Sequence, residues 1–167
     1  GAIFTGATLP VTISTATEGA TIHYKINDGA EQTGASPVSV NVTETTTIVA
    51  YATLDGYENS EENSATYTKV TPISIADART ACTTNGTAVV MDLSGAQVIG
   101  VGGNYMFVQK EGVGICLYQS SPKYKLGDVF ADGSYVAGTA KNYNGLHEIV
   151  DYAITTSGVT NSAIEKN

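Results

Sequence analysis

Apolar and polar residues alternate with a period of two along most of this chain, and that pattern restricts its fold more than any other feature. The pattern is clearest in residues 20–29 (ATIHYKINDG), where Ile22, Tyr24 and Ile26 alternate with polar residues before an Asn-Asp-Gly turn. Such alternation predicts a half-buried β-strand and not a helix. It recurs in both halves of the sequence, so we expect an all-β protein.

Four further alternating runs lie in the first half, at residues 9–13, 38–42, 48–52 and 65–67. Turn residues separate them, at 18–19, 27–29, 34–37 and 55–56. Short strands at this spacing, with no helical period between them, predict a small antiparallel sandwich. We expect this domain to cover residues 1–69.

Two segments of the first half carry a family resemblance. Residues 8–29 (TLPVTISTATEGATIHYKINDG) and 45–68 (TTTIVAYATLDGYENSEENSATYT) resemble the immunoglobulin-like module at the C-terminus of chitobiase and β-hexosaminidase. Bacterial surface proteins and carbohydrate-active proteins reuse this module widely. The resemblance implies an immunoglobulin-like β-sandwich that serves as a spacer or accessory module and has no reaction of its own.

The second half, residues 70–167, predicts one short helix followed by five strands. The helix is expected at residues 75–82 with Ser74 as its cap, because Ile75, Ala78 and Cys82 then share one face. The first strand, residues 88–101, is expected to bend at a bulge at Ser94-Gly95, and the others follow at residues 105–110, 115–118, 135–141 and 146–152. Five strands of which the first is bent fit an OB-fold barrel.

Three segments of this half, residues 105–118, 124–130 and 137–152, resemble OB-fold modules. Such modules occur in exported lipoproteins of gut-type bacteria and in some secreted nucleases, usually without catalytic residues in the barrel. The resemblance implies an exported protein of the bacterial cell surface or periplasm, lipid-anchored in its full-length form. Gly1 already stands at the approach to a strand, which we interpret as a chain whose export signal has been removed.

Alternation also predicts a ligand-binding site on the outside of the barrel. If Met106, Val108, Ile115 and Leu117 fill the interior, their neighbours point outward, on the surface where OB-folds stack bases or sugar rings. These outward residues are Tyr105, Phe107, Gln109, Cys116 and Tyr118, and a turn holding Lys141, Asn142, Tyr143 and Asn144 borders them. All of these except Cys116 are the predicted ligand-binding residues. The alternative is that the outward rings serve as cross-strand packing partners or as an interface with the preceding domain, because strands are enriched in Tyr and Phe in any case.

The charge of the chain indicates which class of ligand to expect first. The chain has a net charge of −8, and its first 69 residues hold eight acidic residues against two lysines. Nucleic-acid binding depends on clustered lysine and arginine, whereas stacking of a saccharide on a ring needs no positive charge. We therefore expect an extended glycan first and single-stranded nucleic acid second.

Few residues offer other chemistry. Cys82 and Cys116 could form a disulfide in an oxidising compartment, although two buried free thiols are the commoner outcome. His23 and His147 fall in different halves, so we expect no metal site, and no pattern indicates a cofactor. His147 beside Glu148 has no nucleophile near it in sequence.

The sequence thus favours a non-enzymatic accessory protein with no apolar run long enough to cross a bilayer. The alternative is a structural or adhesive protein of a surface assembly, with no small ligand and with other surface proteins as partners.

Overall fold

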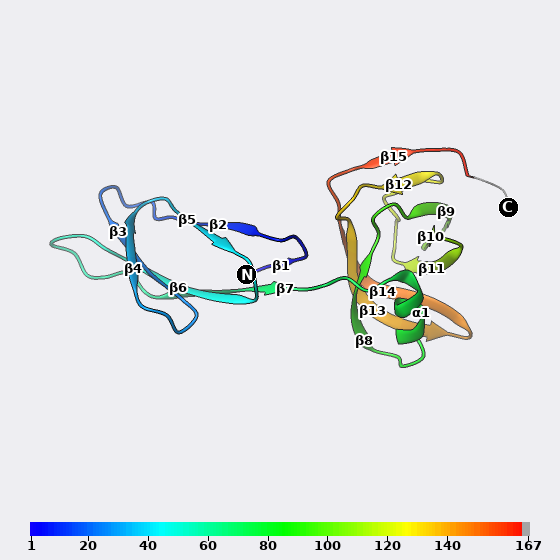
Figure 1. Ribbon diagram of the computed structural model, residues 1–167, viewed down its shortest axis with the longest axis horizontal. Helices are drawn as coiled ribbons and strands as arrows, with labels where there is room; N and C mark the ends of the chain where they lie inside the picture. Colours follow the sequence, from blue (N-terminus) through cyan, green and yellow to red (C-terminus); the bar gives the residue numbers. More distant parts are fainter. Residues whose placement is uncertain (165–167) are drawn as a thin grey trace. The chain divides into compact units, whose positions relative to one another are not determined.

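The computed structural model describes residues 1–164, and the chain divides into two compact units, Gly1–Val70 and Thr71–Asn167 (Figure 1). Strands dominate both units, so the predicted all-β class is confirmed. Each unit has its own hydrophobic core.

The first unit is a β-sandwich. Within residues 1–70, one sheet has the strand order β1-β7-β6-β3-β4 and the other pairs β2 with β5. The strands are β1 (Ile3–Phe4), β2 (Leu9–Ile13), β3 (Thr21–Ile26), β4 (Gln32–Ala35), β5 (Val38–Val42), β6 (Thr46–Thr53) and β7 (Asn63–Lys69). All five alternating runs of the first half form strands, as predicted. Phe4 of β1 and the inward residues Val11, Val40, Val42 and Ile48 of these runs pack into one core.

One turn in this unit is shorter than predicted. A turn was expected over residues 34–37, and Ser36 and Pro37 do separate β4 from β5, but Gly34 and Ala35 lie in β4, where Gly34 pairs with Ile22 of β3. A Cβ on Gly34 would come within 2.8 Å of the Val38 side chain, so glycine is needed there for close packing and not for a turn.

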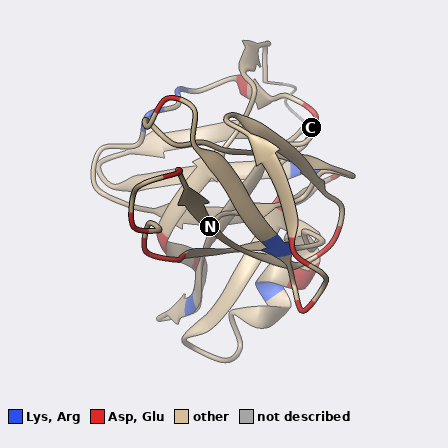
Figure 2. Cartoon of the chain, turned by 90° about the vertical axis from the view of Figure 1, so that its left-hand side faces the viewer, with Lys and Arg blue, Asp and Glu red and all other residues tan. Residues whose placement is uncertain are grey.

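The acidic residues of the first unit lie outside its strands. In residues 1–70, all of which the structure describes, every aspartate and glutamate lies in a loop or turn (Figure 2). The strands themselves therefore contribute little negative charge.

The second unit begins with helix α1 (Ile75–Ala81), which Ser74 caps by accepting a hydrogen bond from the Asp77 N–H group. Its described strands have the order β15-β12-β9-β10-β11-β14-β13-β8. They are β8 (Thr87–Asp92), β9 (Gln97–Gly102), β10 (Tyr105–Lys110), β11 (Val113–Tyr118), β12 (Asp128–Phe130), β13 (Tyr135–Tyr143), β14 (Leu146–Thr155) and β15 (Val159–Asn161).

A sharp corner between β8 and β9 lets this sheet curl round a single core. The corner is fixed by Asp92, whose Oδ1 accepts hydrogen bonds from the Ser94 N–H at 2.9 Å and hydroxyl at 2.6 Å. The sequence predicts a bulge within one long strand at this point. Instead the chain leaves β8, turns through residues 93–96 and enters β9, so β8 pairs with β13 while β9 pairs with β10.

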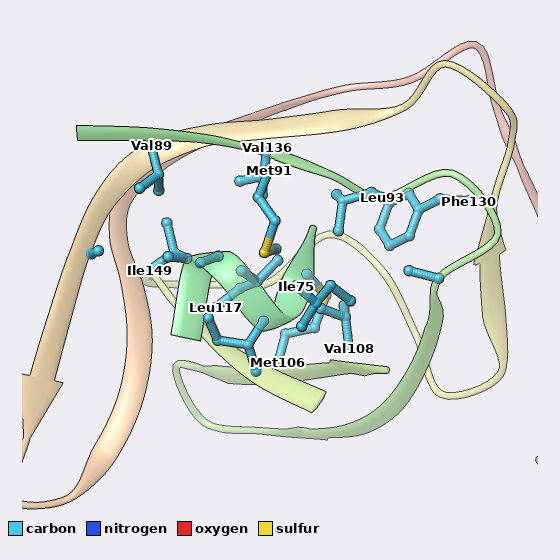
Figure 3. Close-up of a cluster of buried hydrophobic side chains, with 14 of the residues drawn as sticks. Ile75, Val89, Met91, Leu93, Met106, Val108, Leu117, Phe130, Val136 and Ile149 are labelled. Carbon is cyan, nitrogen blue, oxygen red and sulfur yellow. The ribbon is translucent and has the colours of Figure 1, made fainter. Parts of the chain in front are cut away.

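The core of the second unit lies inside this curl (Figure 3). Met106, Val108 and Leu117 have no exposed surface, and Ile115 is buried beside them, so their predicted interior position is confirmed. Helix α1 packs against β8, β11 and β13 and adds Ile75 and Ala78 to the same core.

Two strands of the second unit were not predicted. Both β12 and β15 have three residues, and β15 is exposed along its whole length, so neither carries a readable alternation. In the part of the chain that the structure describes, no helix could span a membrane.

Candidate ligand-binding face

Strand register brings four strands of the second unit together on one outward face. Phe107 pairs with Cys116, Cys116 with Glu148, and Glu148 with Lys141, so this row crosses β10, β11, β14 and β13. A neighbouring row holds Tyr105 and Tyr118. The row between them, Met106, Leu117, Ile149 and Ala140, faces the core and has no exposed surface. We call the outward surface the aromatic face, and define it by Tyr105, Phe107, Cys116, Tyr118, Lys141, Tyr143 and Glu148.

Three rings form the centre of the aromatic face. The rings of Tyr105 and Phe107 are nearly parallel, with centroids 6.4 Å apart, and the Tyr118 ring meets Tyr105 edge-on at 5.0 Å. Both arrangements are favourable for aromatic pairs. Tyr105 remains 36% exposed, while Phe107 and Tyr118 are half-buried.

A glycine on the next strand makes room for one of these rings. Gly100 of β9 pairs with Phe107, and a Cβ at position 100 would lie 3.3 Å from Cδ2 of the Phe107 ring. The ring therefore lies against the bare backbone of β9. A larger residue at this position would push the ring out of place.

Beside the rings lies a pair of opposite charges. Glu148 is buried, with 4% of its side chain exposed, and its Oε1 lies 3.8 Å from the Lys141 Nζ. The Lys141 side chain is 43% exposed, and its Nζ lies 5.2 Å from the centroid of the Tyr143 ring, within range of a cation–π contact. This pair puts a reachable ammonium group over a carboxylate that solvent hardly reaches.

Cys116 does not belong to the exposed part of this face. The alternation predicts it to point outward, and it does lie outside the core cluster, yet only 1% of it is exposed. The residues of neighbouring strands cover it, because it stands in the middle of the four-strand row. Burial, together with the charge of Glu148, raises the pKa of the Cys116 thiol to about 12.

Both cysteines are free and buried, in agreement with the commoner of the two alternatives. Cys82 directs its Sγ toward the Glu148 carbonyl oxygen at 3.5 Å, and burial raises the pKa of its thiol.

The predicted turn residues separate into two groups. Residues 141–143 belong to β13, and the turn itself is Asn144-Gly145, both with positive φ as in the tightest hairpin turns. Lys141 and Tyr143 are on the aromatic face, but Asn142 alternates to the other side. There its N–H donates to Asn85 Oδ1 at 2.7 Å, and its own Oδ1 accepts from Gly145 N–H at 2.8 Å.

Gln109 also lies apart from the rings. It shares the outward side of β10 but lines a cleft of about 600 Å³ together with Gln97, Ile99 and residues 162–164. Of the eight predicted site residues, the structure thus brings together Tyr105, Phe107, Tyr118, Lys141 and Tyr143.

Glu148 is the residue of this face that the sequence prediction missed. Its position opposite Cys116 depends on the parallel pairing of β11 with β14, two strands about 30 residues apart in sequence. A glutamate between Leu146 and Val150, both at outward positions of a strand, was the available signal.

The first unit has a polar cluster of a different kind. His23 stacks on Tyr51, with centroids 4.7 Å apart, and its Nε2 lies 3.0 Å from Thr53 Oγ1. Glu31 accepts from both rings, at 3.1 Å from His23 Nδ1 and 3.3 Å from the Tyr51 hydroxyl. His23 alternates with the apolar residues of β3, and it is half-buried within this network. Among residues 1–164 no group of three or more potential ligands for a metal ion comes together.

Comparisons of the chain with protein-family models, with curated proteins and with solved structures found no significant match.

Proposed function

We propose that this protein is a non-enzymatic accessory protein that binds an extended glycan on the aromatic face of its second unit. The observation that carries the proposal is the contiguous cluster of Tyr105, Phe107 and Tyr118 on the outward side of β10 and β11. Flat, partly exposed rings beside hydrogen-bonding groups are what sugar rings stack on. Single-stranded nucleic acid is the second ligand class that such a surface suits.

The proposal assigns the second unit to the OB-folds. Support comes from the strand order: with β8 and β9 counted as one bent first strand, the described order β9-β10-β11-β14-β13-β8 reads 1-2-3-5-4-1. OB-folds bind oligonucleotides and oligosaccharides on the outer surface that includes their second and third strands. Those strands correspond to β10 and β11, which carry the three rings.

The proposal treats the first unit as an immunoglobulin-like spacer. Its seven strands in two facing sheets, as described for residues 1–70, suit such a sandwich. The sequence resemblance adds the expectation that the protein is exported and is lipid-anchored in its full-length form. Fractionation of cells that make the full-length protein, with and without globomycin to block lipoprotein processing, tests this expectation.

Binding suits the aromatic face better than hydrolysis of a glycan does. Glycosidases need two carboxyl groups flanking the scissile bond. Among the described residues of the aromatic face, Glu148 is the single carboxylate, and Lys141 already pairs with it.

A glycan array followed by calorimetric titration tests the proposal. We expect the protein to bind a saccharide and Tyr105→Ala to weaken that binding about tenfold, because an exposed stacking ring is lost. Tyr57→Ala is the matched control, since Tyr57 is a 75% exposed tyrosine of the first unit. A fluorescent oligothymidylate, titrated in parallel, measures the second ligand class.

Absence of binding to both ligand classes at high protein concentration would leave the rings as packing and refute the proposal. Equal losses for Tyr105→Ala and Tyr57→Ala would also count against the aromatic face.

A structural role in a surface assembly is the second candidate, and the edge of β2 favours it. In residues 1–70, β2 has a hydrogen-bonded neighbour strand on one side only. Next to it runs a cleft of about 440 Å³, lined by Val11, Ile13, Ala50 and Ala65. Such an edge can accept a strand from another copy of the chain.

Sedimentation analysis separates this candidate from the first. A structural role predicts association that Thr12→Lys on β2 reduces, because a charge on an edge strand opposes pairing. Thr33→Lys on β4 is the control. A chain that stays monomeric at high concentration would exclude self-assembly through this edge.

A further inference from the structure

The charge pair of Glu148 and Lys141 points to the class of saccharide that the aromatic face selects. Glu148 is buried in the middle of the four-strand row, and Lys141 lies at its exposed end with its Nζ 3.8 Å from Glu148 Oε1. A ligand that stacks on the rings therefore meets the ammonium group of Lys141, while the carboxylate beneath offsets its charge.

We propose that Glu148 offsets the positive charge of Lys141, so that the aromatic face binds uncharged, hydroxyl-rich saccharides in preference to acidic saccharides and nucleic acids. This inference rests on the proposed function. Within it Lys141 is a ligand-binding residue. Glu148, which solvent hardly reaches, is a positioning residue that acts through Lys141.

The donors of Lys141 suit a hydroxyl group. An ammonium group has three N–H donors, and at 3.8 Å the ion pair with Glu148 is too long to be a hydrogen bond that occupies one of them. The centroid of the Tyr143 ring lies 5.2 Å from the same Nζ. The Lys141 side chain is 43% exposed, so its N–H donors are available to the hydroxyl group of a bound sugar.

Two further titratable groups of the face, Tyr105 and Cys116, are held in their neutral form and do not change this balance. Burial is the main cause that raises the pKa of Tyr105, and the negative charge of Glu148 adds to it. Burial raises the pKa of Cys116 to about 12, so its thiol is uncharged at physiological pH. The charges that remain on the face, among its described residues, are those of Glu148 and Lys141.

A second lysine of this unit is neutralised in the same manner. Lys110 at the end of β10 pairs with Asp92 at 2.9 Å. The lysines nearest to the rings along β10 and β13 therefore both carry a carboxylate partner. A polyanion, whose affinity depends on free cations, gains little from them.

Substitution of Glu148 by glutamine tests the inference, because it removes the carboxylate charge and keeps the size and shape of the side chain. The neutral probes are cello-, xylo- and chito-oligosaccharides, the acidic probe is an oligogalacturonide of equal length, and the polyanion is oligothymidylate. We expect Glu148→Gln to strengthen binding of the acidic probes about fivefold relative to the neutral ones, a typical factor for one exposed ion pair. This gain should shrink between about 50 and 500 mM salt.

The double variant Lys141→Gln/Glu148→Gln is the matched control. It has neither charge, so its preference between neutral and acidic probes should return to that of the unsubstituted protein. Glu148→Gln leaves Lys141 as the charge without a partner, and because 43% of that side chain is exposed, solvent can replace the carboxylate and the variant should fold.

The outcomes separate the two proposals. If the unsubstituted protein binds no saccharide, the proposed function fails and this inference fails with it. If it binds a neutral saccharide but Glu148→Gln leaves the ratio of acidic to neutral binding unchanged, the inference alone is refuted. A preference of the unsubstituted protein for oligogalacturonide or oligothymidylate would also overturn it.

Discussion

Each unit carries rings on the outward side of its strands, but the two groups of rings have different surroundings. In the first unit, His23 and Tyr51 stack on each other and both donate toward Glu31, so the cluster satisfies its own polar groups. In the second unit, Tyr105, Phe107 and Tyr118 meet through their ring faces and edges. The same strand alternation thus produces a closed polar network in one place and an apolar platform in the other.

The cores of the units differ as well. In the described residues, sixteen buried residues form the core of the second unit and five form that of the first. Because hydrophobic stabilisation grows with buried apolar area, we expect the second unit to be the more stable one. The following experiments test these contrasts, from the largest expected effect to the smallest.

Thiol labelling should show the largest effect, and it reports on the second unit alone, because both cysteines lie there. Cys82 is 0% and Cys116 1% exposed. We expect a disulfide reagent at pH 8 to label the native protein at least about a thousandfold more slowly than the urea-unfolded chain, since the reactive thiolate is scarce and covered. Rapid labelling of either thiol in the native protein would contradict the burial.

Truncation of a core side chain should destabilise its own unit. Leu117→Ala removes a side chain with no exposed surface and should lower the free energy of unfolding of the second unit by about 3 kcal/mol. Thiol labelling through unfolding would then become faster. Ile48→Ala in the first unit is the counterpart and should leave thiol labelling unchanged, because the two cores share no residue. Equal acceleration by both variants would show that the units unfold together.

Replacing Lys141 should lower the free energy of unfolding less than a core truncation does, because its side chain is 43% exposed and solvent screens the ion pair with Glu148. We expect Lys141→Gln to lower the free energy of unfolding by about 1 kcal/mol, since Glu148 then lacks its partner. In the Glu148→Gln background the same change should cost close to nothing. Urea unfolding of the four proteins in a double-mutant cycle measures this coupling, and additive effects would argue against the pair.

Acid should have the smallest effect, and it should act on both units through carboxyl groups with a lowered pKa. The backbone N–H of Lys125 and the Asn161 amide hold the pKa of Asp128 below its ordinary value of 3.8, and the hydrogen bond with His23 lowers that of Glu31. A carboxyl group whose pKa is lower in the folded than in the unfolded chain stabilises the fold at any pH above its unfolded pKa. This contribution is lost as the pH falls through the lowered pKa of the folded state.

Urea unfolding at successive pH values below about 4 measures these contributions. The free energy of unfolding of the second unit should fall less steeply with decreasing pH in Asp128→Asn. The corresponding fall for the first unit should be shallower from the start, because Glu31 is exposed, and Glu31→Gln should reduce it further. An unchanged slope in Asp128→Asn would contradict the assigned hydrogen bonds.

Much of this architecture was predictable from the sequence. Alternation of apolar side chains identified five strands in the first half and placed Met106, Val108, Ile115 and Leu117 inside the second unit. It identified Tyr105, Phe107 and Tyr118 as outward rings for the same reason, since a strand that buries one set of residues must turn the alternate set away. The cap Ser74 was equally local, because its partner Asp77 lies three residues away.

Other features depended on which strands become neighbours. The burial of Cys116 and the position of Glu148 between Cys116 and Lys141 follow from pairings across β11, β14 and β13. The short strands β12 and β15 exist because other strands offer them backbone hydrogen bonds. A period of two determines which side of its own strand a residue takes. What covers that side, and which charge it meets there, is decided by strands distant in sequence, since lateral hydrogen bonds join backbones regardless of their side chains.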